Sequence, residues 1–228
     1  MVVSVNCKSI GDAWRECIRA VMNNGVPHFD EDVRLLELSE GFALTVTKPN
    51  LSDPLIERYG DPVVIKRMLK KFKPNLKMED RPFTYGELIY SKNGINQFDW
   101  IVQRILAKPE TKSAAISLIV EGNNAPNIPC LISLDAKLRN DCVDLHFFFR
   151  SQNIFGRQYA NLIALVEFQE KLRSALNCKA GSLSGYISSP HIYDYDLESA
   201  EKVLLGHELN NIDKFYQLGP ESIRGGYS

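Results

Sequence analysis

Cys130 has the surroundings that nucleophilic chemistry requires. The thiol follows a proline in the run IPC at 128–130, and Arg150 ends the apolar run that comes next. A guanidinium group held beside a thiol favours the thiolate, which is the nucleophilic form of cysteine. The alternative is a buried cysteine with a purely structural role, and the sequence around Cys130 leaves both interpretations open.

Two predicted strands bring the thiol and the guanidinium together. Residues 128–139 alternate in character, as a strand with two different faces does. Asn140 and Asp141 favour a turn, and residues 142–150 form the returning strand. If the hairpin folds about Asn140, positions equally far from it face each other, so Arg150 is predicted to lie beside Cys130. The face that carries the thiol then holds Cys130, Ile132, Leu134, Ala136 and Leu138.

Four short motifs, in this order, resemble the signature of the thymidylate synthase family. They are IPC at 128–130, FRS at 149–151, the asparagine Asn161 and HIY at 191–193. The short chain, the PCL around Cys130 and the TYG at 84–86 are most similar to the short archaeal-type branch and to the related pyrimidine-nucleotide hydroxymethylases. The resemblance is specific over residues 95–204 and thin before them.

The resemblance implies a role for each motif. Cys130 is expected to attack C6 of a uracil ring, which makes C5 a carbon nucleophile toward a one-carbon unit. Tyr85 is expected at the rim of the active site as a second catalytic residue. The residues expected to bind the nucleotide are Arg150 and Ser151 at the phosphate, Asn161 at the base, and His191 and Tyr193 at the sugar 3′-hydroxyl.

Asn161 also indicates which base is bound. An amide donates and accepts hydrogen bonds at once, which suits the O4 and N3–H edge of uracil. In cytidylate-specific relatives an aspartate stands at that place, so the resemblance favours dUMP as the substrate.

Two positions depart from the family pattern. Asn153 replaces the aspartate that contacts the reduced-pterin co-substrate, and an amide loses a charge-assisted hydrogen bond. Lys112 and Ser113 stand where the family has two arginines that reach across the dimer to the partner's phosphate, and a lysine lacks the bidentate fork of arginine. These departures keep two alternatives open: a 5-hydroxymethylase acting on dUMP, UMP, dCMP or CMP, and a nucleotide-binding relative without activity.

The family's other features are harder to locate. Its proton-moving glutamate has Glu57 and Glu40 as conceivable counterparts, neither in a matching motif, and Arg34 is a weak candidate for its phosphate loop. The one-carbon donor is expected to be methylene-tetrahydrofolate or methylene-tetrahydromethanopterin. The implied fold is α+β, with a large mixed sheet covered by helices and two subunits stacked sheet on sheet. The aromatic run 147–149 fits a strand buried on both faces in such a homodimer.

Composition sets the broad class. The 228 residues, 44% of them hydrophobic, suit a single domain over 1–228, in which 210–228 is predicted to be a mobile tail. A net charge of −1 gives no field for binding a nucleic acid polymer. We expect no membrane span, no signal peptide and no metal site, and five scattered cysteines favour a reducing, cytoplasmic setting.

Local patterns predict the remaining elements. Ser9 and Asp12 form a capping box that opens a helix closed by Gly25. Further helices are predicted over 63–73, from Gln97 to Lys108, through Leu176 after Asn161, and over 197–205. Strands are predicted twice within 33–48, around a turn at Glu40 and Gly41, and over 114–120 and 181–186.

Overall fold

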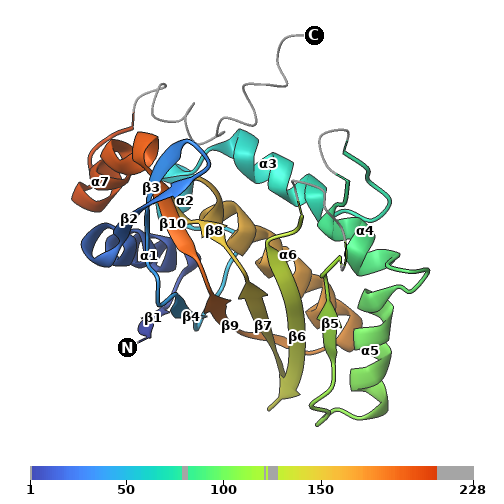
Figure 1. The fold of residues 1–228 in the computed structure, drawn as a ribbon. Coiled ribbons are helices and arrows are strands. Elements are labelled where there is room, and N and C mark those ends of the chain that lie inside the picture. Colours follow the sequence, from blue (N-terminus) through green and yellow to red (C-terminus); the bar gives the residue numbers. More distant parts are fainter. Residues whose placement is uncertain (1, 79–81, 121, 123–127, 210–228) are drawn as a thin grey trace.

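The computed structural model describes residues 2–78, 82–120, 122 and 128–209. The predicted mobile tail at 210–228 therefore lies outside the described residues. Figure 1 shows a large sheet with helices packed along it, in agreement with the predicted α+β class. Among the helices of the described ranges, none combines the length and the apolar character needed to cross a bilayer.

The large sheet has six strands in a mixed arrangement. Its strand order is β1-β4-β9-β7-β6-β5. The β1–β4 and β7–β9 pairs are parallel, and the β4–β9, β6–β7 and β5–β6 pairs are antiparallel. The bounds are Val3–Cys7 for β1, Phe42–Val46 for β4, Lys179–Ile187 for β9, Cys142–Phe149 for β7, Leu131–Arg139 for β6 and Ala115–Ser117 for β5.

A second, four-stranded sheet was not predicted. Its order is β2-β3-β10-β8, with β2 at Val26–Asp30, β3 at Val33–Glu37, β10 at Pro190–Tyr193 and β8 at Gln152–Asn153. The two strands predicted within 33–48 exist as β3 and β4, and Gly41 between them has a positive φ of 61°. They belong to different sheets, however, because β3 pairs with β2 and β10 while β4 pairs with β1 and β9.

Most of the predicted helices are present. Ser9 accepts a hydrogen bond from the Asp12 N–H, so the predicted cap opens α1. The helix α2 was missed, although Asp53 and Asp61 each stand before a proline and accept N–H bonds from the first turns of α2 and α3. The bounds are Ile10–Asn24 for α1, Pro54–Tyr59 for α2, Pro62–Lys71 for α3, Tyr85–Tyr90 for α4, Gln97–Ala107 for α5, Tyr159–Leu176 for α6 and Leu197–Leu205 for α7.

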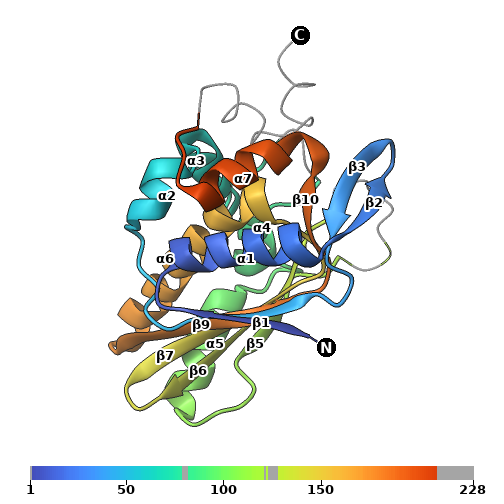
Figure 2. The ribbon, with the colours of Figure 1, turned by 90° about the vertical axis from the view of Figure 1, so that its left-hand side faces the viewer.

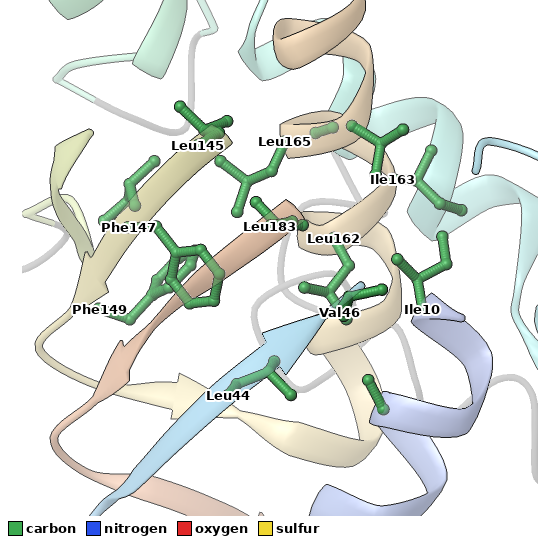
Figure 3. Close-up of a cluster of buried hydrophobic side chains, with 14 of the residues drawn as sticks. Ile10, Leu44, Val46, Leu145, Phe147, Phe149, Leu162, Ile163, Leu165 and Leu183 are labelled. Carbon is green, nitrogen blue, oxygen red and sulfur yellow. The ribbon is translucent and has the colours of Figure 1, made fainter. Parts of the chain in front are cut away.

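The helix α6 forms the centre of the core. Figure 3 shows its residue Leu165 directed toward Leu145 and Leu183 of the sheet, and Leu162 next to Val46 of β4. All five side chains are buried. Burying aliphatic side chains of this size contributes roughly 1.5–3 kcal/mol each. The α6 side chain of Gln169 also donates to three strand carbonyls, those of Val143, Gly181 and Ser182.

The hairpin register differs from the prediction. The turn uses both Asn140 and Asp141 with positive φ, so the pairing is centred between them and Arg139 faces Cys142. An irregularity at Ile132 then shifts the register, and Leu131 faces Phe149. Such a bulge inserts one residue into one strand. The predicted face is therefore wrong at its start, because Leu131 is buried while Ile132 is only half-buried.

The aromatic run in β7 is buried on one face only within the single chain. Phe147 and Phe149 are 4% and 1% exposed, whereas Phe148 points the other way and stacks on Tyr186. Figure 2 shows α1 and α6 along the same face of the large sheet. Within one chain the helices cover a single face, so burial of this strand on both faces, which was expected of a homodimer, stays a prediction.

Candidate active site

Cys130 lies at the entrance of β6, held by Arg150. The Arg150 N–H donates to the Cys130 carbonyl at 2.9 Å, so the two residues are neighbours despite the altered register. The guanidinium donates to the carbonyls of Pro129 at 3.1 Å and Ile128 at 3.0 Å. Arginine has five N–H donors, so the exposed guanidinium can hold this loop and still offer donors to an anion.

Tyr85 approaches the same place from α4. The Thr84 and Glu87 side chains form a capping box that begins this helix. The Tyr85 ring packs on Phe72 at 4.8 Å, and its hydroxyl accepts a hydrogen bond from the Leu131 N–H at 3.4 Å. A phenol therefore lies beside the residue that follows Cys130.

Close packing explains why a glycine, Gly86, follows Tyr85. A Cβ at Gly86 would lie 1.9 Å from the Lys73 carbonyl oxygen, so only glycine lets α4 approach this backbone. The close contact at Gly86 thus helps to position the hydroxyl of the preceding residue, Tyr85.

The FRS and HIY motifs meet through short backbone pairings. The Ser188 N–H donates to the Phe149 carbonyl and the Gln152 N–H to the Ser189 carbonyl. In the small sheet, His191 of β10 then pairs with Asn153 of β8. Half-buried Ser151 lies in the link between β7 and β8, between these two pairings.

The surroundings of His191 favour the neutral form of its imidazole. Burial lowers its pKa below the usual value, while the Ser189 carbonyl acts in the opposite sense. Because a carbonyl can only accept, the contact of 3.1 Å puts the proton on Nδ1 and leaves Nε2 as an acceptor. The Tyr193 ring lies edge-on to His191, and its hydroxyl donates to Asp30 at 2.7 Å.

Asn161 sits in the first turn of α6, directly after a π-helical turn, η1, at Ile154–Gln158. Such turns are rare and often occur at functional sites. Asn161 is 5% exposed, and its Nδ2 donates to the Arg157 carbonyl at 3.1 Å. Its buried Oδ1 has no hydrogen-bond partner within the part of the chain that the structure describes. A buried amide oxygen of this kind is suited to a ligand donor.

The Asn153 side chain is engaged in a contact within the chain. Its Oδ1 caps η1 by accepting from the Gly156 N–H at 2.7 Å. Asp196, at the end of the short 3₁₀ turn η2 (Asp194–Asp196), lies next to the Asn153 amide. The sequence did not single out Asp196, because an aspartate ahead of a helix is ordinarily interpreted as a cap.

Lys112 is not brought to Cys130 within one chain. Its backbone carbonyl accepts from Lys137 of β6, and the stretch from Cys130 to Lys137 spans roughly 23 Å of extended chain. In Figure 1 the α5–β5 loop, which holds Lys112, lies at the opposite end of β6 from its entrance. The exposed Lys112 side chain can serve this site only from another subunit.

The candidates for the proton-moving glutamate and for the phosphate-loop arginine lie in other surroundings. Glu57 is exposed and accepts from the Ser52 hydroxyl at 2.6 Å, and Glu40 is exposed at the turn before β4. Arg34 of β3 pairs with Asp194 at 3.5 Å, on the sheet that carries His191.

Comparisons with known proteins support one family. No family model matches the chain. A Methanosarcina mazei protein named "Putative thymidylate synthase" is 26% identical over 210 residues, covering 89% of this chain and 94% of the relative. A protein of the same name from Methanothermobacter thermautotrophicus is 24% identical, covering 90% and 99%. The "Deoxyuridylate hydroxymethyltransferase" of Bacillus phage SP01 is 28% identical over 120 residues, 49% of this chain and 31% of the phage protein.

The two archaeal relatives carry the family name that the motifs around Cys130 indicated, and they align with nearly the whole chain. The resemblance to the thymidylate synthase family is therefore confirmed, with the archaeal proteins named "Putative thymidylate synthase" as full-length relatives and a deoxyuridylate hydroxymethyltransferase as a partial one.

Proposed function

We propose that this protein transfers a one-carbon unit from a reduced pterin to C5 of dUMP, in a thymidylate synthase-type reaction. The observation that carries the proposal is the convergence at the entrance of β6, where Arg150 and the Tyr85 hydroxyl both contact the backbone around Cys130. The coarser statement, an enzyme that modifies pyrimidine nucleotides, is supported by the names of the relatives.

Cys130 acts as the nucleophile. Its thiolate forms a bond to C6 of uracil, and the C5–C6 π electrons move onto C5 and O4, which makes C5 nucleophilic. After C5 has bonded to the one-carbon unit, its proton must leave, and we assign a part in that transfer to the Tyr85 hydroxyl, which contacts the Leu131 N–H beside Cys130. The bond between the one-carbon unit and its carrier nitrogen breaks as the C5 proton is lost, which gives an exocyclic methylene. Addition of hydride to that methylene in a synthase, or of water in a hydroxymethylase, then expels the thiolate from C6, restores the C5–C6 double bond and regenerates Cys130.

The remaining side chains bind the nucleotide. Asn161 Oδ1 accepts from N3–H, and Nδ2, which already donates to Arg157, has a second hydrogen for O4. His191 Nε2 accepts from the sugar hydroxyl, beside Tyr193. Arg150 and Ser151 bind the phosphate, for which a guanidinium is the best-matched side chain.

The reduced pterin supplies the one-carbon unit and, in a synthase, the hydride that converts it to a methyl group. Asn153, the β8 residue paired with His191, is the proposed contact for it. The residues present fit such a ring, because Asn153 Nδ2 carries two hydrogens, of which one can serve the neighbouring carboxyl of Asp196 and the other the ring. Methylene-tetrahydrofolate and methylene-tetrahydromethanopterin both meet this requirement.

A 5-hydroxymethylase is the second candidate. Asn153 lacks the charge of the family's carboxylate, and weaker retention of the pterin favours attack of water on the exocyclic methylene. The similarity to the phage hydroxymethyltransferase supports the same alternative. A nucleotide-binding relative without activity is the third.

Trapping the covalent adduct tests the proposal. Mass spectrometry of the protein with 5-fluoro-dUMP and a methylene-tetrahydropterin should show an adduct on the Cys130 peptide, and Cys130→Ser should show none. Cys142→Ser, on the neighbouring strand, is a matched control that should still be labelled. Absence of an adduct with either carrier, with Cys130→Ser behaving like the native chain, would leave only the nucleotide-binding relative.

Product analysis decides between the two enzymes. The protein is incubated with dUMP, UMP or dCMP and each carrier. A 5-methyl product with rising dihydropterin absorbance is expected. A 5-hydroxymethyl product without that rise would replace the synthase by the hydroxymethylase.

The complete site requires a dimer in this proposal. Lys112 lies too far along β6 to reach Cys130 of its own chain, and the face of the large sheet that carries Phe148 and Tyr186 is only partly covered. Stacking two such faces would give the sheet-on-sheet homodimer of a thymidylate synthase-like fold, with residues 1–228 as one domain.

A further inference from the structure

Asp196 has a buried carboxyl that does not cap the helix it precedes, α7. It occupies the N-cap position of α7, where an aspartate normally accepts from the first helical N–H groups. Here the side chain makes no capping bond, and the residue is 0% exposed. Neither carboxyl oxygen has a hydrogen bond of ordinary geometry to the described residues. Burying such a group is costly, so its environment has to account for it.

The carboxyl faces η1 instead. Burial raises the pKa of Asp196 to about 7, and Arg157 and the Asn153 amide act in the opposite sense by stabilising the anion. The charge of Asp196 also contributes to raising the pKa of Tyr159, at the start of α6. The Tyr159 hydroxyl accepts a hydrogen bond from the Asp61 N–H at 3.2 Å. On α7 itself, the exposed Glu198 pairs with Lys202 at 2.9 Å.

Asn153 connects this carboxyl to the base-binding asparagine. Its Oδ1 holds the Gly156 N–H at 2.7 Å, which leaves Nδ2 for Asp196. One residue further, the Arg157 carbonyl accepts from Asn161 Nδ2 at 3.1 Å. Movement of η1 therefore moves the Asn161 amide as well.

The other side of η1 is fixed. Trp14 donates from Nε1 to the Ile154 carbonyl at 2.9 Å, and its ring packs against Phe155 and Tyr159 at 5.9 and 4.8 Å. Trp14 is fully buried. With this side pinned by α1, the Asp196 side is where η1 can be adjusted.

We propose that Asp196 is a positioning residue for this site and that it acts on Asn161 through Asn153 and η1. Asp196 thereby supplies, from a distant segment, the carboxyl that is absent from the Arg-Ser-Gln-Asn sequence at 150–153. The inference rests on the proposed function, because it assigns Asn161 to the uracil base. Ionised Asp196 draws the Asn153 amide and Arg157 toward itself and holds η1 in the binding geometry. Protonated Asp196 loses that attraction, so nucleotide binding tightens as the pH rises through about 7.

Calorimetric titration with dUMP alone, between pH 5.5 and 8.5, tests the proposal without any pterin. The native chain should bind at least about fivefold more tightly at the alkaline end than Asp196→Asn, a nearly isosteric change that stays neutral. At the acid end the two proteins should bind alike. Glu198→Gln removes a charge from the exposed side of the same helix and should follow the native curve. The phosphate of dUMP titrates equally in all three proteins, so only the difference between curves counts.

Asn153→Ala provides a second variant in case Asp196→Asn does not fold. This variant keeps the Asp196 carboxyl but removes the Asn153 amide that connects it to η1. The pH dependence of dUMP binding should become flatter, as in Asp196→Asn. If a folded variant of either kind retains the native pH curve, Asp196 has no positioning role. If the native chain binds no uracil nucleotide at any pH, the proposed function fails and the inference fails with it.

Discussion

Asn161 is the residue that should decide which base is bound. It is almost fully buried, with one amide hydrogen on the Arg157 carbonyl and its oxygen directed at no described partner. A carboxyl placed there would be desolvated and would favour its protonated form, which can donate to N3 of cytosine and accept from its N4 amine.

We therefore expect Asn161→Asp to shift preference from dUMP toward dCMP by on the order of 10- to 100-fold, the effect of exchanging one or two buried hydrogen bonds. Competition binding with the two nucleotides measures the ratio. Asn177→Asp makes the same change at the exposed far end of α6 and should leave the ratio alone. An unaltered ratio in Asn161→Asp would mean that the base is read by other residues.

Asp196 should also make stability depend on pH. Its pKa is raised from 3.8 to about 7 in the folded chain, mainly by burial, so between these values the folded state binds more protons than the unfolded state. The free energy of unfolding then falls as the pH rises through this window and levels off above about 7.

Asp196→Asn should remove this fall. Between pH 5 and pH 8 the free energy of unfolding of the variant should rise relative to that of the native chain by up to about 2.7 kcal/mol, because about two pKa units of the shift fall within this range. Urea unfolding at both pH values measures the difference. Equal stability differences at pH 5 and pH 8 would show that the folded state does not perturb Asp196.

At the scale of elements, α4 is positioned by its closest contact. Gly86 touches the Lys73 backbone after α3, and this contact places the Tyr85 hydroxyl against Leu131. We expect Gly86→Ala to force α4 outward, because the new Cβ would lie 1.9 Å from a backbone oxygen.

The expected cost of Gly86→Ala is about 1–3 kcal/mol of stability, typical of overpacking, together with a larger loss of activity than of dUMP affinity. Chemical denaturation and the adduct assay report the two effects. Lys66→Ala, on the exposed side of α3, should change stability by no more than about 0.5 kcal/mol. A Gly86→Ala protein with native stability and native adduct formation would contradict this account of the Tyr-Gly pair.

At the scale of the whole molecule, the proposed site depends on two chains. Lys112 and Cys130 lie near opposite ends of β6, so a lysine that helps to bind the phosphate must come from the partner. The half-exposed aromatic pair of Phe148 and Tyr186 lies on the sheet face that such a partner would cover.

Mixing Cys130→Ala with Lys112→Ala chains should therefore restore activity, to about a quarter of the native value, because half of the dimers are mixed and each has one intact site. Adduct formation in the mixture measures it, with each parent alone as the control. No recovery above the parents, or sedimentation as a monomer at micromolar concentration, would exclude a shared site.

Local patterns in the sequence determined the parts of this protein that depend on neighbouring residues. The cap at Ser9, the start of α5 at Gln97 and the extent of α7 agree with the structure, since caps and helical periodicity are local properties. The order of the motifs around Cys130 likewise indicated the family, because side-chain chemistry is visible in the chain itself. The hairpin turn was located correctly, but its register was not.

Only the tertiary structure decided which distant segments meet. The bulge at Ile132 offsets the shift that the two-residue turn introduces and so keeps Arg150 beside Cys130. The small sheet joins β8 to β10 through pairings too short to leave a periodic pattern in the sequence. Asp196 has the sequence pattern of a helix cap, yet it lies in the core against Asn153, because burial depends on packing between segments that are far apart in the chain.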